Sequence, residues 1–343
     1  MLVCPRRMNN DDGTCKHHMP ATEEEPGFCK LPSQFQCIDM IAARSPRLSH
    51  SSVLDWIKCR KLFYLKAIRG VQKRPEAMGK ALKMGALWDV CQGKMYGRHG
   101  NEEIYKVIDE YQIEEMEVSI VRAMVKAANK LGLAKPDDEC QLQERFVFKT
   151  TFEKIYPWNT EPGFDFLVTG VYDRLYGDYF AENKFTSRPD NYLDVFNLTS
   201  QVGTYFLSNS ALKYCIMEVV RAPSLRAKED EEPEQFGARL YEDVMKRPGF
   251  YFIGYKNGAY GKKFFRNEFN LENLALRYKN IAFEVMDAAA RDAFYGNETA
   301  CTTPWECDML EICKSGVVSD TLYRYRDKVS EERSALLAAG EKF

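Results

Sequence analysis

Residues 170–184 read GVYDRLYGDYFAENK and place two apolar runs around the dipeptide Gly177–Asp178. A glycine supplies the positive φ that a two-residue turn demands, so this stretch predicts a β-hairpin. Partners across such a hairpin have residue numbers that sum to 355, which sets Asp173 directly opposite Glu182. Counted outward from the loop, the pair falls at a non-hydrogen-bonded position, where Cα atoms lie about 4.5 Å apart. Lys184 is two residues beyond Glu182 and therefore lies on the same face.

Two carboxylates held this close repel each other. At about 5 Å and an effective dielectric constant of about 20 the repulsion costs about 3 kcal/mol, and sheets disfavour like charges in opposite positions. A Mg²⁺ or Mn²⁺ ion removes this repulsion because hard cations bind carboxylate oxygens. Such an ion polarises a phosphoryl oxygen and lowers the pKa of a bound water, while Lys184 can stabilise the developing charge. The pattern favours metal-dependent phosphodiester cleavage; the alternative is an ordinary exposed hairpin with a Glu–Lys surface pair.

Three other residues are candidates for the same site. Gln201 and Tyr205 are four positions apart in a stretch with helical spacing, so they share one face of a helix. Glu144 alternates with apolar neighbours in LQERFVF and can direct a third carboxylate toward the metal. Without the hairpin, each of them would be an ordinary helix or strand residue.

Four of the eleven cysteines follow a one-plus-three arrangement: Cys59, Cys301, Cys307 and Cys313. Four thiolates from converging segments can bind an iron–sulfur cluster, which would tie an N-terminal helix to the C-terminal part of the chain. We favour such a cluster over a zinc site. Three further cysteines stand singly on apolar stretches, which indicates buried core thiols: Cys91, Cys140 and Cys215.

The first 40 residues differ from the rest and hold four more cysteines: Cys4, Cys15, Cys29 and Cys37. The intervals between them fit no tight CxxC zinc signature. This segment is therefore either a small zinc-binding module or a disordered leader. We expect residues 41–343 to form the nuclease domain.

The overall composition is that of a globular protein with a substantial core, since 45% of the residues are hydrophobic and 13% are aromatic. The beginning of the chain has no apolar signal-peptide core, and no apolar run approaches the ~20 residues of a membrane span. An odd number of cysteines, eleven, does not suggest a disulfide framework. These features predict a cytoplasmic protein, or one in another reducing compartment, without a membrane partner.

The net charge of −2 provides no overall basic field. Residues 44–74 nevertheless carry nine Lys/Arg against one acid, and such a stripe can bind a polyanion locally. Arg60, Lys61 and Lys66 are interleaved with aromatic residues, an arrangement that can follow phosphates while a ring stacks on a base. The alternative is a solvated helix face.

The hydrophobic periodicity predicts an α/β fold in which helices flank a central mixed sheet. Strands are expected at residues 141–152, 166–175, 179–185, 214–221, 249–255 and 264–269. Helices are expected from Ser49 onward, with Cys59 inside, and over residues 77–94, 102–131, 190–210 and 271–294.

The motifs GVYD, ENK and QVGTY follow one another in this order, and in this the chain resembles the RecB-type branch of the PD-(D/E)XK nuclease superfamily. The stretch SHSSVLDWIKCRKLFYL (residues 49–65) is similar to the helix with which this family begins. Iron–sulfur members include the AddB nuclease domain and CRISPR-associated and eukaryotic single-strand exonucleases. They place one cysteine in that helix and three near the C-terminus. The resemblance covers residues 48–315.

This resemblance implies a restriction-endonuclease-like fold with Asp173 and Glu182 as metal ligands and Lys184 as the catalytic lysine. It implies active-site roles for Gln201 and Tyr205 on the following helix. It also implies that the four cysteines of the one-plus-three set bind a 4Fe–4S cluster.

The chain departs from the family pattern in two places. The family's G-x-x-H helix motif has its counterpart in residues 85–88, where Trp88 stands in place of the histidine. Asp89 and Glu144 are the candidates to substitute for this ligand, and the number of metal ions is left open. The C-terminal cysteines are separated by five residues each, which is wider than the common C-x-x-C start.

These observations together predict a nuclease that uses Mg²⁺ or Mn²⁺, specifically an exonuclease acting on single-stranded DNA, with recombination or replication proteins as candidate partners. One alternative is a catalytically inactive DNA-binding or recombination accessory protein that keeps the fold and the cluster. A weaker alternative is a zinc-stapled interaction protein.

Overall fold

The computed structural model describes residues 47–97, 99–111, 113–133, 140–152, 164–193, 199–303 and 306–326. The chain divides into two compact units, which we call the cysteine unit and the sheet unit. The cysteine unit comprises Met1–Gln72, Val147–Thr169 and Glu272–Phe343; the sheet unit comprises Lys73–Phe146 and Gly170–Leu271. The leader and its candidate zinc ligands lie outside the described residues: Cys4, Cys15, Cys29 and Cys37.

A mixed sheet is the centre of the fold, as the sequence predicts. Its strands follow the order β1-β4-β5-β6-β7, and β3 pairs with β4. The β5–β6 and β1–β4 pairs are parallel, whereas β4–β5 and β6–β7 are antiparallel. The strands are β1 (Arg47–Leu48), β3 (Gln141–Phe152), β4 (Phe164–Leu175), β5 (Tyr179–Thr186), β6 (Tyr214–Arg221) and β7 (Lys262–Phe265).

Helices cover both faces of the sheet in the sheet unit. Side chains alternate along β5, so Phe180 and Phe185 point to opposite faces. Phe180 packs against Phe206 of α8 (Ser200–Ser208), with ring centroids 5.2 Å apart. Phe185 packs against Trp88 of α4 (Lys80–Tyr96) at 5.8 Å. The sheet therefore has α8 on one face and α4 on the other.

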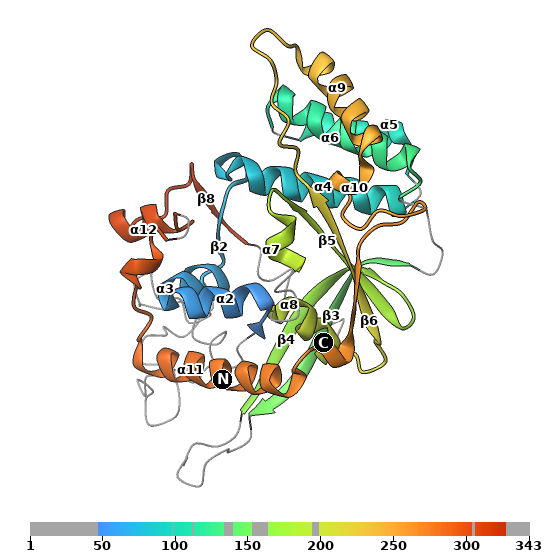
Figure 1. Ribbon diagram of the computed structural model, residues 1–343. Coiled ribbons are helices and arrows are strands. Elements are labelled where there is room, and N and C mark those ends of the chain that lie inside the picture. Colours follow the sequence, from blue (N-terminus) through green and yellow to red (C-terminus); the bar gives the residue numbers. More distant parts are fainter. Residues whose placement is uncertain are drawn as a thin grey trace, which may run out of the picture. The chain divides into compact units, whose positions relative to one another are not determined.

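A second layer of helices lies against α4. It consists of α5 (Asn101–Glu110), α6 (Glu115–Lys130) and α9 (Pro233–Lys246), which share one apolar core with α4 (Figure 1). Two short helices complete the unit: α7 (Pro189–Leu193) and α10 (Pro248–Tyr251). Cys91 and Cys215 are fully buried, as predicted, whereas Cys140 is half-buried next to the start of β3.

The cysteine unit begins with α2 (His50–Lys58). Ser49 and Ser52 cap this helix reciprocally, because the hydroxyl of each accepts a hydrogen bond from the backbone N–H of the other. The chain continues through α3 (Arg60–Phe63) and a π-helical turn (Tyr64–Ile68).

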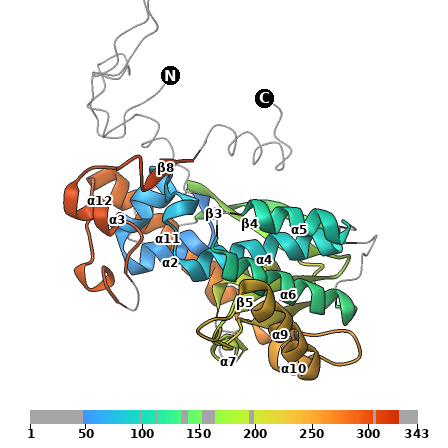
Figure 2. The same cartoon turned by 90° about the horizontal axis from the view of Figure 1, so that it is seen from above.

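The C-terminal part of the cysteine unit packs against these helices, as Figure 2 shows. Its elements are α11 (Leu271–Arg291), a 3-10 turn (Glu298–Ala300), α12 (Leu310–Ser315) and β8 (Tyr323–Tyr325). Strand β8 pairs with β2 (Val71–Lys73). The two parts share one apolar cluster, which includes Leu62, Leu65, Val71, Met309, Ile312 and Tyr323.

Some expected elements differ from the observed ones. The single helix expected over residues 102–131 is divided into α5 and α6, because Tyr111 adopts an extended backbone (φ −79°, ψ 132°). Acidic residues in the first turn of α6, Glu115 and Glu117, favour a new helix start there. The strand expected over residues 249–255 begins as α10, because Pro248 occupies the first position of a helical turn.

Three further differences are smaller. The helix expected over residues 190–210 is divided into α7 and α8, the last expected strand is β7 followed by a 3-10 turn, and α9 was not expected. Strands β3 and β6 have the bounds that the sequence predicts. Within the described residues, no helix combines the length and the apolarity that crossing a membrane requires.

Gly170, the first residue of GVYD, leaves room for an aromatic ring. A Cβ atom added there would lie 2.3 Å from Phe146 Cζ. Phe146 also contacts the rings of Tyr172 and Tyr205, with centroids 5.0 and 5.5 Å away, so it has little room to move. We expect Gly170→Ala to lower the free energy of unfolding by about 1–3 kcal/mol, measured by urea denaturation.

Gly93 in α4 provides the matched control, because an added Cβ meets nothing within 4 Å. Gly93→Ala should raise the free energy of unfolding by up to about 1 kcal/mol, since alanine is the better helix former. If the two variants proved equally stable, the proposed clash at Gly170 would be disproved.

Candidate active site and cysteine cluster

The predicted hairpin is formed by β4 and β5. Its loop is Gly177–Asp178, closed by a hydrogen bond from the Tyr176 N–H to the Tyr179 carbonyl (2.9 Å). The paired residues, such as Arg174 with Ala181, keep the expected sum of 355. The φ of Gly177 is not in the positive range, contrary to the prediction. The stacked rings of Tyr176 and Tyr179, with centroids 4.3 Å apart, flank the loop and help to hold it.

Asp173 does not pair with Glu182 in the backbone ladder, and this part of the prediction is wrong. The ladder ends at Arg174–Ala181, and the Asn183 N–H donates to Asp173 Oδ2 (2.7 Å). The side-chain carboxylate thus competes with backbone carbonyls as an acceptor. Asp173 therefore lies against the β5 backbone, next to Glu182 rather than opposite it.

The carboxylate of Glu182 is the most buried group of the candidate site, with 1% of the residue exposed. Its Oε1 accepts hydrogen bonds from Lys184 Nζ and from Gln201 Nε2, the latter at 2.5 Å. Gln201 Nε2 also lies 3.1 Å from the Tyr205 hydroxyl, so α8 contributes both residues that the sequence predicts for it. Glu182 Oε2 is buried without a hydrogen-bond partner among the described residues.

Asp173 is electrostatically coupled to acids on both sides of the sheet. Burial, with the negative charge of Glu182, raises the pKa of Asp173 to about 7. Burial, with the charge of Asp173, raises the pKa of Asp89 on α4 to about 6, although Lys184 and Asn183 oppose the rise. Asp173 is thus coupled to Glu182, which contacts α8, and to Asp89, which belongs to α4.

The structure distinguishes the two substitutes for the missing histidine. Trp88 is buried in the core against Phe185 and does not face a metal site. Asp89, the next residue, is coupled to Asp173 as described above. Glu144 is exposed on β3. The electrostatic coupling makes Asp89 the candidate of choice, and the ligand roles of Asp89 and Glu144 both stay predictions.

Asp173 and Glu182 are the members of the acidic cluster that could hold a divalent cation. A cation would satisfy the unpartnered Glu182 oxygen and would offset the negative charge that raises the pKa of both aspartates. No three His, Cys, Asp or Glu side chains in the described part of the chain enclose a metal ion by themselves. Mg²⁺ commonly binds through one or two carboxylates and keeps several waters. Asp173 and Glu182 fit that mode.

Cys59 lies at a break between α2 and α3, where its extended backbone (φ −166°, ψ 120°) interrupts the helix that the sequence predicts to continue. The loop after α11 reaches this break through Asn297. The Asn297 N–H donates to Cys59 Sγ (3.4 Å), and its Nδ2 donates to the Lys58 carbonyl (2.9 Å). Cys301 Sγ donates in turn to the Asn297 carbonyl (3.7 Å). Asn297 therefore connects the first two cysteines of the predicted set.

The other two cysteines lie in the same group. Burial raises the pKa of Cys307, and the charges of Cys59 and Cys301 add to the rise. Burial likewise raises the pKa of Cys313, with contributions from the three other cysteines. The four cysteines of the one-plus-three set are thus neighbours in space.

Whether the four thiols bind a polynuclear cluster, as the sequence predicts, or a single zinc ion stays a prediction. Sulfurs that bind one zinc ion at about 2.3 Å lie about 4 Å from one another, and no three cysteines among the described residues are gathered as a single-ion site. In a 4Fe–4S cluster each thiolate binds a different iron. Lys58 and Lys61 partly oppose the rise in the pKa of Cys307 and Cys313 respectively, but both pKa values remain raised.

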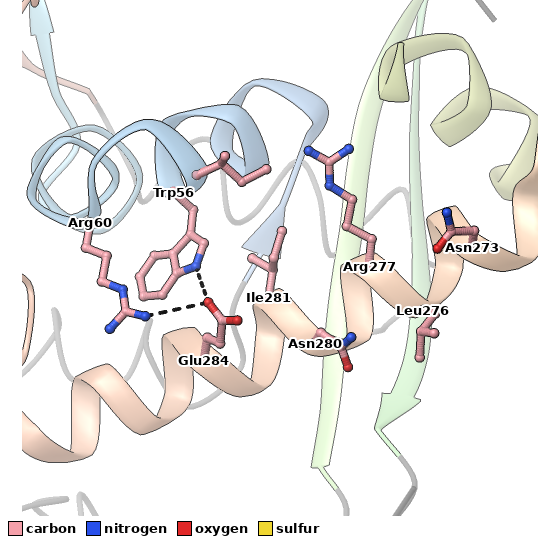
Figure 3. Close-up of a pocket in the computed structure, with 9 residues that line it drawn as sticks. Trp56, Arg60, Asn273, Leu276, Arg277, Asn280, Ile281 and Glu284 are labelled. Carbon is pink, nitrogen blue, oxygen red and sulfur yellow. Dashed lines mark hydrogen bonds and ion pairs between the residues drawn. The ribbon is translucent and has the colours of Figure 1, made fainter. Parts of the chain in front are cut away.

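Arg60, one of the predicted DNA-binding residues, lines a groove of about 490 Å³ between α2 and α11 (Figure 3). Its guanidinium stacks on the Trp56 ring, 5.0 Å from the centroid, and pairs with Glu284 at 3.7 Å. The Trp56 Nε1–H also donates to Glu284 (2.8 Å). Arg277 projects from α11 into the same groove, as Figure 3 shows.

The two lysines of the predicted DNA-binding set also have neighbours within the cysteine unit. Lys66 forms an ion pair with Asp55 (3.2 Å), and Lys61 lies near Cys313. Part of the basic stretch therefore has a structural role, and DNA binding by these residues stays a prediction.

Sequence reasoning missed three residues that organise the two sites: Arg174, Asn183 and Asn297. Arg174 is 2% exposed. The sequence offered a signal for it, because a charged residue inside a predicted strand must find a partner if the strand is buried. Asn183 stands between Glu182 and Lys184 in the ENK motif but was not considered. Asn297 carries no comparable signal, because its role depends on the contact between distant segments.

The raised aspartate pKa values make the stability of the metal-free protein depend on pH. An unfolded aspartate ionises near pH 3.9, whereas Asp173 and Asp89 keep their protons up to about pH 7 and about pH 6. The folded state then binds more protons, so the free energy of unfolding should fall as pH rises from about 4 to about 7. Urea unfolding of metal-free protein checks this, and Asp173→Asn should weaken the decline. A free energy that rises through this window would refute the assignment.

If the predicted iron–sulfur cluster is bound by the four cysteines, Asn297 should help to retain it. Asn297→Ala removes the hydrogen bond to the Lys58 carbonyl and loosens the loop that carries Cys301. After anaerobic purification, we expect this variant to lose iron to a chelator faster than the wild type, and Cys59→Ser to contain little iron. Asn280→Ala on α11 serves as the control. Purified wild-type protein that contains zinc and no iron would contradict the cluster assignment.

A scan of the chain against protein-family models finds no match, and a search of curated proteins finds none either. The interpretation of both sites therefore depends on the residues and contacts described above.

Proposed function

We propose that this protein is a metal-dependent DNA nuclease whose active site is built around Asp173, Glu182 and Lys184. The observation that supports this most strongly is the Glu182 carboxylate. One of its oxygens contacts Lys184 and Gln201, and the other is buried without a partner among the described residues. An acidic metal site beside an ammonium group is suited to phosphodiester hydrolysis.

The contacts suggest a role for each side chain. Asp173 and Glu182 would hold the Mg²⁺ or Mn²⁺ ion, which when bound polarises a phosphoryl oxygen and lowers the pKa of a water. Lys184 contacts Glu182 Oε1, and its side chain is 22% exposed, so its ammonium can reach a phosphate at the surface of the cluster. Gln201 and Tyr205 orient the Glu182 carboxylate through Oε1, which leaves Oε2 for the metal.

The substrate that we propose is single-stranded DNA, cleaved from its ends. This proposal is supported by the resemblance to RecB-type nucleases with an iron–sulfur cluster. Arg60, Lys61 and Lys66 are candidate contacts to the phosphates. Recombination or replication proteins are the candidate partners, and a reducing compartment is the candidate location.

We propose that the iron–sulfur cluster has a structural role and links two segments of the cysteine unit. Its candidate ligands come from two parts of the cysteine unit, Cys59 from the segment after α2 and three cysteines from the segment after α11. Ligand binding that requires both segments contributes directly to folding free energy.

A non-catalytic DNA-binding protein is the second candidate. The observation that favours it is the buried Trp88 in place of the usual histidine. Asp89, coupled to Asp173, favours catalysis instead. The two candidates differ in whether purified protein cleaves DNA.

Substitutions at the acidic cluster test the proposal directly. Glu182→Ala and Lys184→Ala should abolish Mn²⁺-dependent cleavage of end-labelled single-stranded DNA, because they remove a metal ligand and the catalytic ammonium. Asp89→Ala should lower the rate strongly, whereas Glu144→Ala should not if Asp89 is the substitute ligand. Lys213→Ala, which removes an exposed lysine paired with Asp178, is the matched control. Wild-type protein that binds single strands without cleaving them would support the second candidate.

A further inference from the structure

Asn183 lies at the centre of the acidic cluster but differs in chemistry from its neighbours Glu182 and Lys184. Its backbone N–H donates to Asp173 Oδ2 (2.7 Å). Its side-chain amide hydrogen-bonds to the Asp89 carboxylate. One residue therefore contacts two of the three acids, one through the backbone and the other through the side chain.

The orientation of the Asn183 amide is set by a buried arginine. Arg174 Nη2 donates to Asn183 Oδ1 (2.8 Å). The Arg174 guanidinium has donors only, so the carbonyl end of the amide must face it. The NH₂ end is then left for Asp89, which as a carboxylate accepts hydrogen bonds. Without Arg174 the amide could rotate and present its oxygen to Asp89, which would repel it.

Arg174 is itself held by a buried acid from β6. Its Nη2 lies 2.7 Å from Glu218 Oε2, and its guanidinium lies 3.8 Å from the centroid of the Tyr96 ring. Glu218 also accepts hydrogen bonds from Gln92 Nε2 (2.8 Å) and from the Tyr96 hydroxyl (3.4 Å). Arg174 and Glu218 are 2% and 7% exposed, so the pair is shielded from solvent.

A buried ion pair of this kind is weak evidence for stability, since well-packed apolar residues often do as well or better. The stronger reason for the Arg174–Glu218 pair is that it orients the Asn183 amide. The three connected residues come from three strands: Arg174 from β4, Asn183 from β5 and Glu218 from β6. Through Asn183 this series of contacts reaches Asp89 and Asp173.

We infer that Asn183 is a positioning residue that holds Asp89 and Asp173 for the metal ion, and that the Arg174–Glu218 pair fixes the orientation of Asn183. This inference rests on the proposed function, because it assigns the two aspartates to a metal site. It adds a second layer of contacts to that site, on residues that do not bind the metal.

The test is Mn²⁺ binding to the full-length protein, measured by calorimetry and by electron paramagnetic resonance, together with urea unfolding of the metal-free form. Loss of a residue that orients metal ligands typically costs about 10–100-fold in metal affinity. Asn183→Ala should therefore weaken Mn²⁺ binding by about this factor, and Asn183→Ser, which keeps a small hydrogen-bonding group, should recover part of the loss. Asn129→Ala, which removes a hydrogen-bonded asparagine on the exposed surface of α6, should bind Mn²⁺ as the wild type does.

The double variant Arg174→Met/Glu218→Gln separates positioning from stability. It removes both charges together, so no unpaired charge is buried, and the glutamine keeps an acceptor for Gln92. We expect it to unfold at a urea concentration close to that of the wild type but to bind Mn²⁺ about as weakly as Asn183→Ala.

The outcomes distinguish this inference from the proposed function. If the wild type binds Mn²⁺ and cleaves DNA but the Asn183 variants and the double variant bind Mn²⁺ with wild-type affinity, the inference is overturned and the proposed function stands. If the wild type neither binds Mn²⁺ nor cleaves DNA, the proposed function fails and the inference fails with it. Weak binding in the double variant at wild-type stability supports the inference even if Asn183→Ala does not fold.

Discussion

The hydrogen bond from the Asn183 N–H to the Asp173 carboxylate is the contact on which the candidate active site depends. It ends the backbone ladder between β4 and β5 and turns Asp173 toward the strand that carries Glu182 and Lys184. Burial and the negative charge of Glu182 act on Asp173 together, and its pKa rises to about 7. The proposed function assigns a cation to this group of acids, which also contains the buried Glu182 oxygen without a partner among the described residues.

The two candidate sites are built on different principles. The acidic cluster lies on adjacent strands, so short-range backbone geometry brings most of its members together. The cysteine cluster joins segments far apart in the chain, and its local contacts are few, chiefly those of Asn297 with Cys59 and Cys301. A bound cluster would therefore add more to the stability of the cysteine unit than a bound Mg²⁺ ion would add to the sheet unit.

Much of the fold could be predicted because it follows from local patterns. Alternation of apolar residues set the bounds of β3 and β6, and the Gly177–Asp178 loop set the register of the hairpin. The helices were predicted less well. Tyr111 breaks one expected helix, Cys59 breaks another, and α10 replaces an expected strand, because caps and packing compete with periodicity at these places.

The sequence by itself determined the motif order, the residue types of both sites, and the common face of Glu182 and Lys184, since side-chain alternation is a property of any strand. Only the tertiary structure decided that Asp173 contacts β5 through its side chain, that Asp89 rather than Glu144 is coupled to it, and that Arg174 meets Glu218. The physical reason is that these contacts join strands and helices whose separation along the chain carries no information about their distance in space. Burial, which makes such charges significant, exists only after the layers have packed.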